Sequence, residues 1–196
     1  MRTEVSIPLE GRRLLVAVSG SIAAVKTPLL VSALVKAGAE VRCLVTPSAA
    51  KLVSPLALAS LSRHRCYTED DGWDSSCSRP LHIELAEWAE LVLLAPLSAT
   101  SLSRWSQGSA DGLLASVLLA CECPVLAAIA MNTAMWSHPA VQRNWQIVQT
   151  FPGVVPLMPQ PGLLACDRLG DGRMADPMLI ELAASILFSR GDTWPV

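Results

Sequence analysis

The sequence predicts an α/β protein built as a three-layer, Rossmann-like (flavodoxin-like) parallel sheet with helices on both faces. Short runs that are apolar, apart from Arg42 in the second, occur at Leu14–Val18, Val41–Val45, Leu91–Ala95 and Val125–Ala130. Such runs are typical of parallel strands that are buried on both faces. Between the first two runs, apolar residues recur at helical spacing over residues 22–37, so strand, helix and strand predict a right-handed βαβ unit.

The remaining segments continue this alternation. Gly38 follows the first helix and is expected to end it, as glycine commonly does. Residues 63–80 are polar and predict a surface loop, and residues 154–157 predict a fifth strand. Residues 158–177 are rich in Pro and Gly without a period, which is typical of a long functional loop. Further helices are expected over residues 47–53, 56–61, 102–106, 111–119, 139–148 and 178–188.

Length and composition indicate one domain over residues 1–196, with residues 1–12 as an N-terminal extension. The chain is 52% hydrophobic and only 16% charged, so we expect a cofactor or sister subunits to cover part of its surface. A net charge of -2 gives no electrostatic basis for binding nucleic acid or an anionic membrane. The six cysteines have neither metal-site nor disulfide spacing, and no metal site is expected.

The location expected for the chain is cytoplasmic. Its start has no signal-peptide pattern, and no apolar run approaches the roughly 18 residues that span a bilayer. No ligase domain follows within the sequence, so we expect the enzyme that makes the substrate to be a separate chain.

Small and polar residues follow four of the predicted strands, at 19–21, 46–48, 96–101 and 130–132. In parallel α/β sheets, ligands bind beyond the carboxyl ends of the strands, where helix N-termini offer free N–H groups to phosphate. The first turn is neither G-x-G-x-x-G nor a Walker A loop, which disfavours dinucleotides and triphosphates. A mononucleotide such as FMN fits better, although each turn alone could equally serve as a helix N-cap.

Four segments now make a family comparison specific, namely Val16–Ala24, Pro80–Ala89 with His-Ile-Glu-Leu, Ala95–Leu102, and Ala130–Pro139 with Met-Asn-Thr-Ala-Met-Trp. Together they resemble the flavin-dependent cysteine decarboxylases, most closely those that act on phosphopantothenoylcysteine in coenzyme A biosynthesis. The resemblance runs from about residue 14 to residue 177. It implies FMN bound at a subunit boundary of a homotrimer, a small cysteine conjugate as substrate, and conversion of 4'-phosphopantothenoylcysteine to 4'-phosphopantetheine.

The resemblance also implies site residues. The positions matching the cofactor site are Gly20, Ser21, Ile22, Ser48, Ser98, Ala99, Thr100, Ser101 and Ala130. The positions matching catalytic residues are His82, Asn132 and Cys166. Substrate contacts are expected from Asn132, Met131, Ala165 and Arg173.

The chemistry of the family explains these residue types. A flavin that takes a hydride from the carbon bearing sulfur creates a C=S electron sink for decarboxylation, and the returned hydride then reduces the enethiol. His82 would act as base or charge stabiliser, Asn132 would hold the carboxylate, and Cys166 would protonate the enethiol from a Gly-rich flap over residues 158–177. The alternatives are a capping or core His, an Asn N-cap and an inert Cys.

The sequence departs from the family pattern at several positions. Thr100 and Ser101 stand where the family usually has Asn and Thr, and Asp167 stands where it usually has Gly. Two other functions therefore stay open. One is decarboxylation of a peptide that ends in cysteine, and the other is a non-catalytic regulatory flavoprotein.

Overall fold

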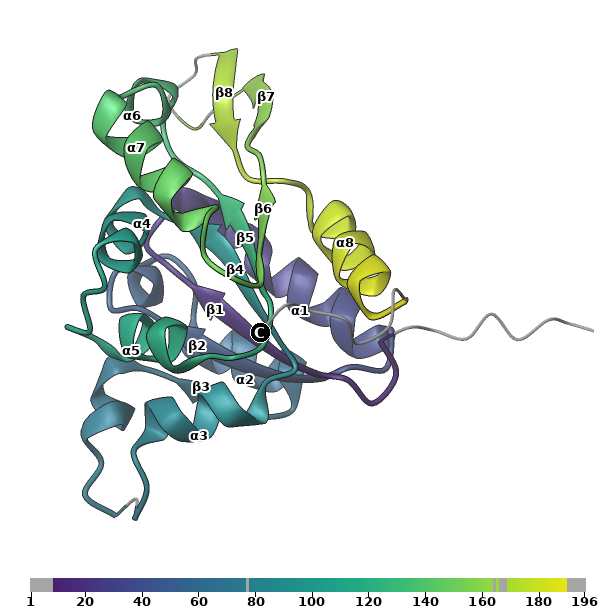
Figure 1. The fold of residues 1–196 in the computed structure, drawn as a ribbon. Coiled ribbons are helices and arrows are strands. Elements are labelled where there is room, and N and C mark those ends of the chain that lie inside the picture. Colours follow the sequence, from purple (N-terminus) through teal and green to yellow (C-terminus); the bar gives the residue numbers. More distant parts are fainter. Residues whose placement is uncertain (1–8, 77, 164, 166–168, 190–196) are drawn as a thin grey trace, which may run out of the picture.

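The protein is organised around a six-stranded, fully parallel sheet with strand order β3-β2-β1-β4-β5-β6 (Figure 1). The structure, a computed structural model, describes residues 9–76, 78–163, 165 and 169–189. The strands are β1 (Arg13–Val18), β2 (Glu40–Val45), β3 (Cys66–Tyr67), β4 (Leu91–Leu97), β5 (Val125–Ile129) and β6 (Val154–Leu157). This is the Rossmann order, whereas a flavodoxin sheet runs 2-1-3-4-5, and it places the topological switch point between β1 and β4.

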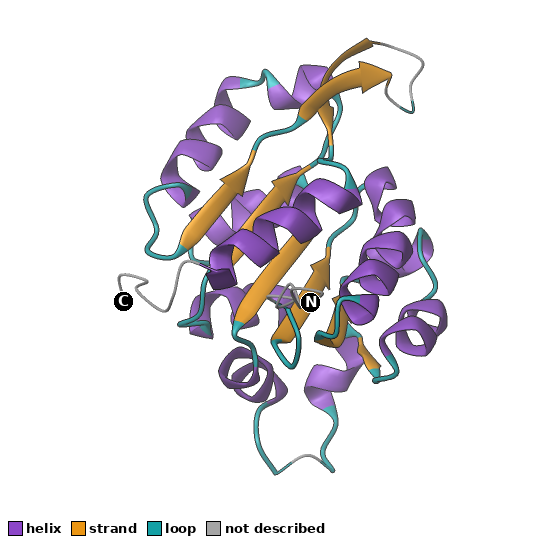
Figure 2. Cartoon of the chain, turned by 90° about the vertical axis from the view of Figure 1, so that its right-hand side faces the viewer, coloured by secondary structure: helices purple, strands orange, loops and turns teal. Residues whose placement is uncertain are grey.

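Helices cover both faces of the sheet, which confirms the predicted three layers (Figure 2). Along β1, Val16 faces one core while Leu15 and Ala17 face the other, as the alternation of a strand requires. The first core is closed by α1 (Thr27–Lys36), α2 (Pro55–Ser62) and α8 (Pro177–Ser189). The second is closed by α3 (Leu81–Trp88), α4 (Ala99–Ser106), α5 (Leu113–Ala120) and α7 (Pro139–Val148).

The predicted strands and most predicted helices are confirmed, and the helix expected over residues 22–37 divides in two. Its first turn is the 3-10 helix η1 (Ile22–Lys26), and α1 follows directly. Two further short elements are the 3-10 helix η2 (Ala49–Lys51) and the helix α6 (Thr133–Trp136). Leu9, which lies in the predicted N-terminal extension, is fully buried in the first core.

Two loop predictions were wrong. The segment 63–80 contains strand β3 and the 3-10 helix η3 (Glu69–Trp73). Here Glu69 accepts the Leu113 N–H at the start of α5, at 3.0 Å, so this acidic residue serves a helix N-terminus. The described part of 158–177 contains an antiparallel hairpin of β7 (Gln160–Leu163) and β8 (Leu169–Arg173).

No helix in the described part of the chain is long and apolar enough to cross a membrane. Over the same residues, no group of three or more His, Cys, Asp or Glu side chains gathers as a metal site would require.

Candidate functional site

The ends of β1 and β4 are joined at the switch point by one buried side chain. Ser19 is fully buried, and its hydroxyl donates to the Pro96 carbonyl and accepts the Ser98 N–H, both at 2.7 Å. On the other side of β4, the Ala130 N–H donates to the Leu97 carbonyl at 3.0 Å. The turns after β1, β4 and β5 are therefore fixed side by side at the carboxyl edge of the sheet.

A cavity of about 510 Å³ opens between these turns and the β7–β8 hairpin. Its walls are mainly apolar with a few hydroxyl, amide and charged groups, as is usual for a site that binds a small organic molecule. The lining residues are Gly20, Ser21, Ile22, Ala23, Val25, Lys26, Ser98, Ala99, Thr100, Ala130, Met131, Asn132, Met135, Leu163, Ala165, Gly172, Arg173 and Met174. We call this the switch-point cavity.

One end of the switch-point cavity is a close contact between two turns. A Cβ built on Gly20 would lie 2.5 Å from the Ser48 Cβ. The turn after β1 can therefore come this close to the turn after β2 only because residue 20 is a glycine. Next to it, the Ser21 hydroxyl accepts the Ala23 N–H at 3.4 Å. Ser98 similarly accepts the Ser101 N–H at 3.3 Å and begins α4. The small residues thus serve as N-caps and line the cavity at the same time.

The opposite end is formed where the hairpin packs on the turn after β5. The Met131 N–H donates to the Gly172 carbonyl at 3.0 Å. A Cβ on Gly172 would collide with the Met131 carbonyl oxygen, and Gly172 also has φ of +145°, a conformation that favours glycine. Asn132 begins α6, and its side-chain oxygen accepts the Ala134 N–H at 2.8 Å.

Most of the site residues expected from the sequence therefore meet in one place, because all but four line the switch-point cavity. Ser48 lies behind Gly20. Ser101 is buried and lines an adjoining cavity of about 190 Å³. Cys166 lies outside the described residues.

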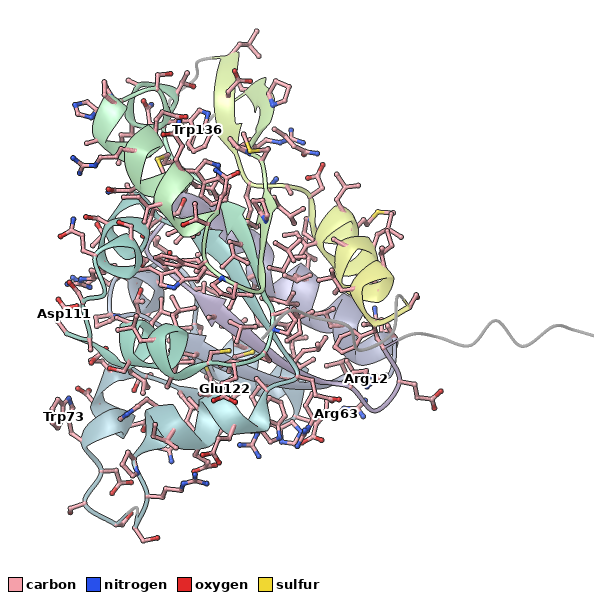
Figure 3. All side chains as sticks on the ribbon, in the orientation of Figure 1. Arg12, Arg63, Trp73, Asp111, Glu122 and Trp136 are labelled. Atoms are coloured by element: carbon pink, nitrogen blue, oxygen red, sulfur yellow. The ribbon has the colours of Figure 1, made fainter. Side chains whose placement is uncertain are left out.

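His82 is the fourth exception and lies far from this cavity. It sits in the first turn of α3 and lines a separate cavity of about 660 Å³, together with Trp73. Trp136, in α6 beside Asn132, and Trp73 stand at opposite ends of the molecule in Figure 3. Within one copy of the chain, His82 and Asn132 thus belong to different cavities.

The chain matches the family described as Flavoprotein over residues 2–183. It belongs to the flavoprotein family. Among curated relatives, this flavoprotein is 40% identical over 188 residues to the coenzyme A biosynthesis bifunctional protein CoaBC of Bacillus subtilis (strain 168), a match that covers 96% of this chain and 46% of that protein. The chain thus spans about half the length of the curated relatives it matches.

Solved structures support the same assignment. A PPC decarboxylase mutant with serine in place of a cysteine, complexed with pantothenoylaminoethenethiol, has a TM-score of 0.85 and 34% identity, covering 92% of this chain and 100% of that one. The FMN binding protein AtHal3 has a TM-score of 0.83 and 34% identity, with coverage of 93% and 99%. The chain is therefore a member of the flavin-dependent cysteine decarboxylases, near PPC decarboxylase, as its motifs indicated.

Several lining residues of this flavoprotein were missed by the sequence analysis. Lys26 is the most informative, since it is the only cation within the apolar segment 22–35 and faces the cavity. A single charged residue among apolar neighbours was the feature of the sequence that could have indicated a functional role for Lys26. Gly172 and Met174 lie within the predicted flap, but nothing in a segment without a period indicated which residues would face inward.

The described cysteines do not contribute to the switch-point cavity. Burial raises the pKa of the Cys43 thiol, and burial raises that of Cys66 to about 12. Both thiols therefore stay protonated and inert. The sulfur atoms of Cys121 and Cys123 lie 3.1 Å apart near the amino end of β5. The hydrogen bond between the two thiols lowers the pKa of Cys121 and raises the pKa of Cys123.

Proposed function

We propose that this flavoprotein binds FMN and catalyses the decarboxylation of 4'-phosphopantothenoylcysteine to 4'-phosphopantetheine in coenzyme A biosynthesis. The observation that carries the proposal is the switch-point cavity, which gathers the family's motif residues from β1, β4, β5 and the hairpin. Among solved structures, the PPC decarboxylase complexed with pantothenoylaminoethenethiol supports it. The activity named for CoaBC is a property of a protein about twice as long.

The residues present fit FMN. Ser21 lines the cavity beside the Gly20–Ser48 contact, at the end where a phosphate would bind, and its hydroxyl can donate a hydrogen bond there. Thr100 adds a hydroxyl from α4, and apolar walls such as Ala130 and Met131 suit a flat aromatic ring. When bound, FMN supplies the two-electron chemistry, accepting a hydride from the substrate and returning it.

The chain's own residues would orient the substrate and move its protons. Asn132 would donate its amide to the cysteine carboxylate while it caps α6, with Met131 and Ala165 beside it. Cys166, from the predicted flap over residues 158–177, would protonate the enethiol. His82 would stabilise charge or act as base, which requires that it reach the substrate.

The separation of His82 from Asn132 supports a homotrimer in which each site lies between two copies. A neighbouring copy would then bring its α3 cavity, with Trp73 84% exposed, against the exposed switch-point cavity of the next. Ile22 and Val25 line that cavity and are also more than half exposed, as expected of a surface that a partner covers. We further propose that this single-domain enzyme, with residues 1–12 as an extension, acts in the cytoplasm.

The proposal is tested by turnover on two substrates. Purified protein is mixed with phosphopantothenoylcysteine or with a peptide ending in cysteine, and loss of CO2 is followed by mass spectrometry. We expect a yellow protein that turns over only the first. Turnover of the peptide alone would instead make it a peptidyl-cysteine decarboxylase, and bound flavin without turnover of either would make it a regulatory flavoprotein.

A further inference from the structure

Three charged side chains form a cluster at the edge of the switch-point cavity. Asp176 accepts from the Arg173 guanidinium at 3.0 Å and from the Lys26 ammonium at 3.5 Å. Lys26 is the last residue of η1 and Arg173 is the last residue of β8, so the cluster connects the segment after β1 to the β7–β8 hairpin. We call Lys26, Arg173 and Asp176 the rim cluster.

The Arg173 side chain is held in place by its surroundings. A Cβ on Gly162 would lie 3.2 Å from Arg173 Nη1, so the guanidinium packs directly over this glycine. Its Nε is buried and has no hydrogen-bond partner in the described part of the chain. A buried donor without a partner is costly, and an anion bound beside it would relieve that cost.

The rim cluster carries a net charge of +1, because two cations share one carboxylate. Among the described residues that line the cavity, Lys26 and Arg173 are the only two with a formal charge. All three side chains are between a third and a half exposed, so a ligand can reach them. A phosphate monoester carries a charge of about -1.5 to -2 at neutral pH and can compete with Asp176 for both cations.

The position of the rim cluster separates it from the proposed cofactor phosphate. Lys26 lies five residues beyond Ser21, which corresponds to about 10 Å at the rise of roughly 2 Å per residue in a 3-10 helix. The cofactor phosphate is proposed at the Gly20–Ser21 end, beside Ser48. A second phosphate at the rim cluster would therefore belong to another molecule.

The reacting carboxylate is also a poor ligand for two cations. Its negative charge is delocalised into the substrate as CO2 leaves, so cations beside it would stabilise the ground state more than the transition state. The neutral amide of Asn132 holds a carboxylate without that penalty. The phosphate keeps its charge throughout the reaction, so cations beside it add binding energy in every state.

We propose that Lys26 and Arg173 bind the terminal phosphate of the substrate, in exchange for Asp176, and so select phosphopantothenoylcysteine over pantothenoylcysteine. This inference rests on the proposed function. Lys26 and Arg173 are specificity residues that act through binding, and they take no part in the transfer of protons or electrons.

The test compares two substrates that differ only in the phosphate. Lys26→Met and Arg173→Met are each expected to lower kcat/KM for phosphopantothenoylcysteine by about 10- to 100-fold, the effect of removing a hydrogen bond to a charged group, and to change it by less than about twofold for pantothenoylcysteine. Lys36→Met, at the exposed C-terminal end of α1, is the matched control and should leave both substrates unaffected.

Three results would overturn the inference. An equal loss on both substrates would mean that the cations hold the hairpin or the carboxylate, and no change on either would mean that they bind nothing. Loss of the flavin absorbance would assign them to the cofactor phosphate. If the wild-type protein turned over neither substrate, the proposed function would be wrong, and calorimetric binding of phosphopantetheine against pantetheine to the flavin-loaded variants would still decide the role of the cations.

Discussion

At the scale of single residues, the contact between Gly20 and Ser48 determines how closely two turns approach at the end of the cavity proposed for the cofactor phosphate. Gly20 does not have the positive φ that would exclude alanine, so a substitution there is limited by space alone. Alanine would place its Cβ 2.5 Å from the Ser48 Cβ, inside normal contact distance. The two positions are therefore expected to be strongly coupled.

We predict that Gly20→Ala lowers the free energy of unfolding by about 1–3 kcal/mol, the usual cost of overpacking, and weakens FMN binding. Ser48→Gly removes the obstructing Cβ, so Gly20→Ala should cost much less in that background. Denaturant unfolding of the apoprotein measures the change in the free energy of unfolding, and titration with FMN measures the change in its affinity. Additive effects in the double variant would show that the two turns do not meet as described.

At the scale of elements, Glu90 joins the beginnings of two central strands. Its carboxylate accepts the Arg13 N–H at 2.8 Å and the Arg12 guanidinium at 3.1 Å, so β1 and β4 are tied just before they pair. Arg12 also lies 4.9 Å over the ring of Phe188 in α8. Partial burial raises the pKa of Glu90, but these hydrogen bonds lower it by more, so its pKa lies below the ordinary value.

We predict that Glu90→Gln lowers the free energy of unfolding at pH 7 by about 1 kcal/mol, because solvent screens this partly exposed pair. A carboxyl group whose pKa is lowered on folding contributes stability above its unfolded pKa, and that stability is lost as pH falls through the folded pKa. The difference between variant and wild type should thus vanish in acid. Glu122→Gln, at an exposed position, is the control and should match wild type; a pH-independent deficit would refute the ion-pair explanation.

The elements also differ in how well the sequence predicts them. Strands β4 and β5 are apolar throughout, and β1 and β2 are mostly apolar, so their apolar runs indicate them. Strand β3 has two residues, too few for a period, and is placed by pairing with β2 and by packing of Cys66 and Tyr67 on the cores. In β8, Gly170 and Gly172 are required by contacts with Thr133 and Met131, and such long-range contacts leave no local pattern.

The same limit applies to the site. Motif residues that follow strands could be placed together, because parallel strands end at one edge. The position of His82 could not be predicted in this way, since it depends on how α3 packs and not on a strand end. The role proposed for Lys26 depends on its position beside Asp176 and Arg173, which lie about 150 residues later in the chain.

At the scale of the whole molecule, the proposed function requires His82 and Asn132 to act in one site, whereas within one copy they line separate cavities. Figure 1 places α3 and α6 at opposite ends of the molecule. Exposed apolar side chains include Ile22, Val25, Leu29 and Trp73. A cyclic assembly that places the α3 end of one copy against the switch-point cavity of the next would cover such side chains and bring the imidazole to the amide.

We therefore predict that two inactive variants restore activity when they share an assembly. His82→Asn removes the imidazole, while Asn132→Asp removes the amide and keeps an oxygen that can cap α6. After the two are unfolded and refolded together in equal amounts, random assembly should give about one quarter of sites with both native groups. Each variant refolded alone is the control. A mixture that stays as inactive as its parents would mean that both groups act from the same copy, and the shared site would be wrong.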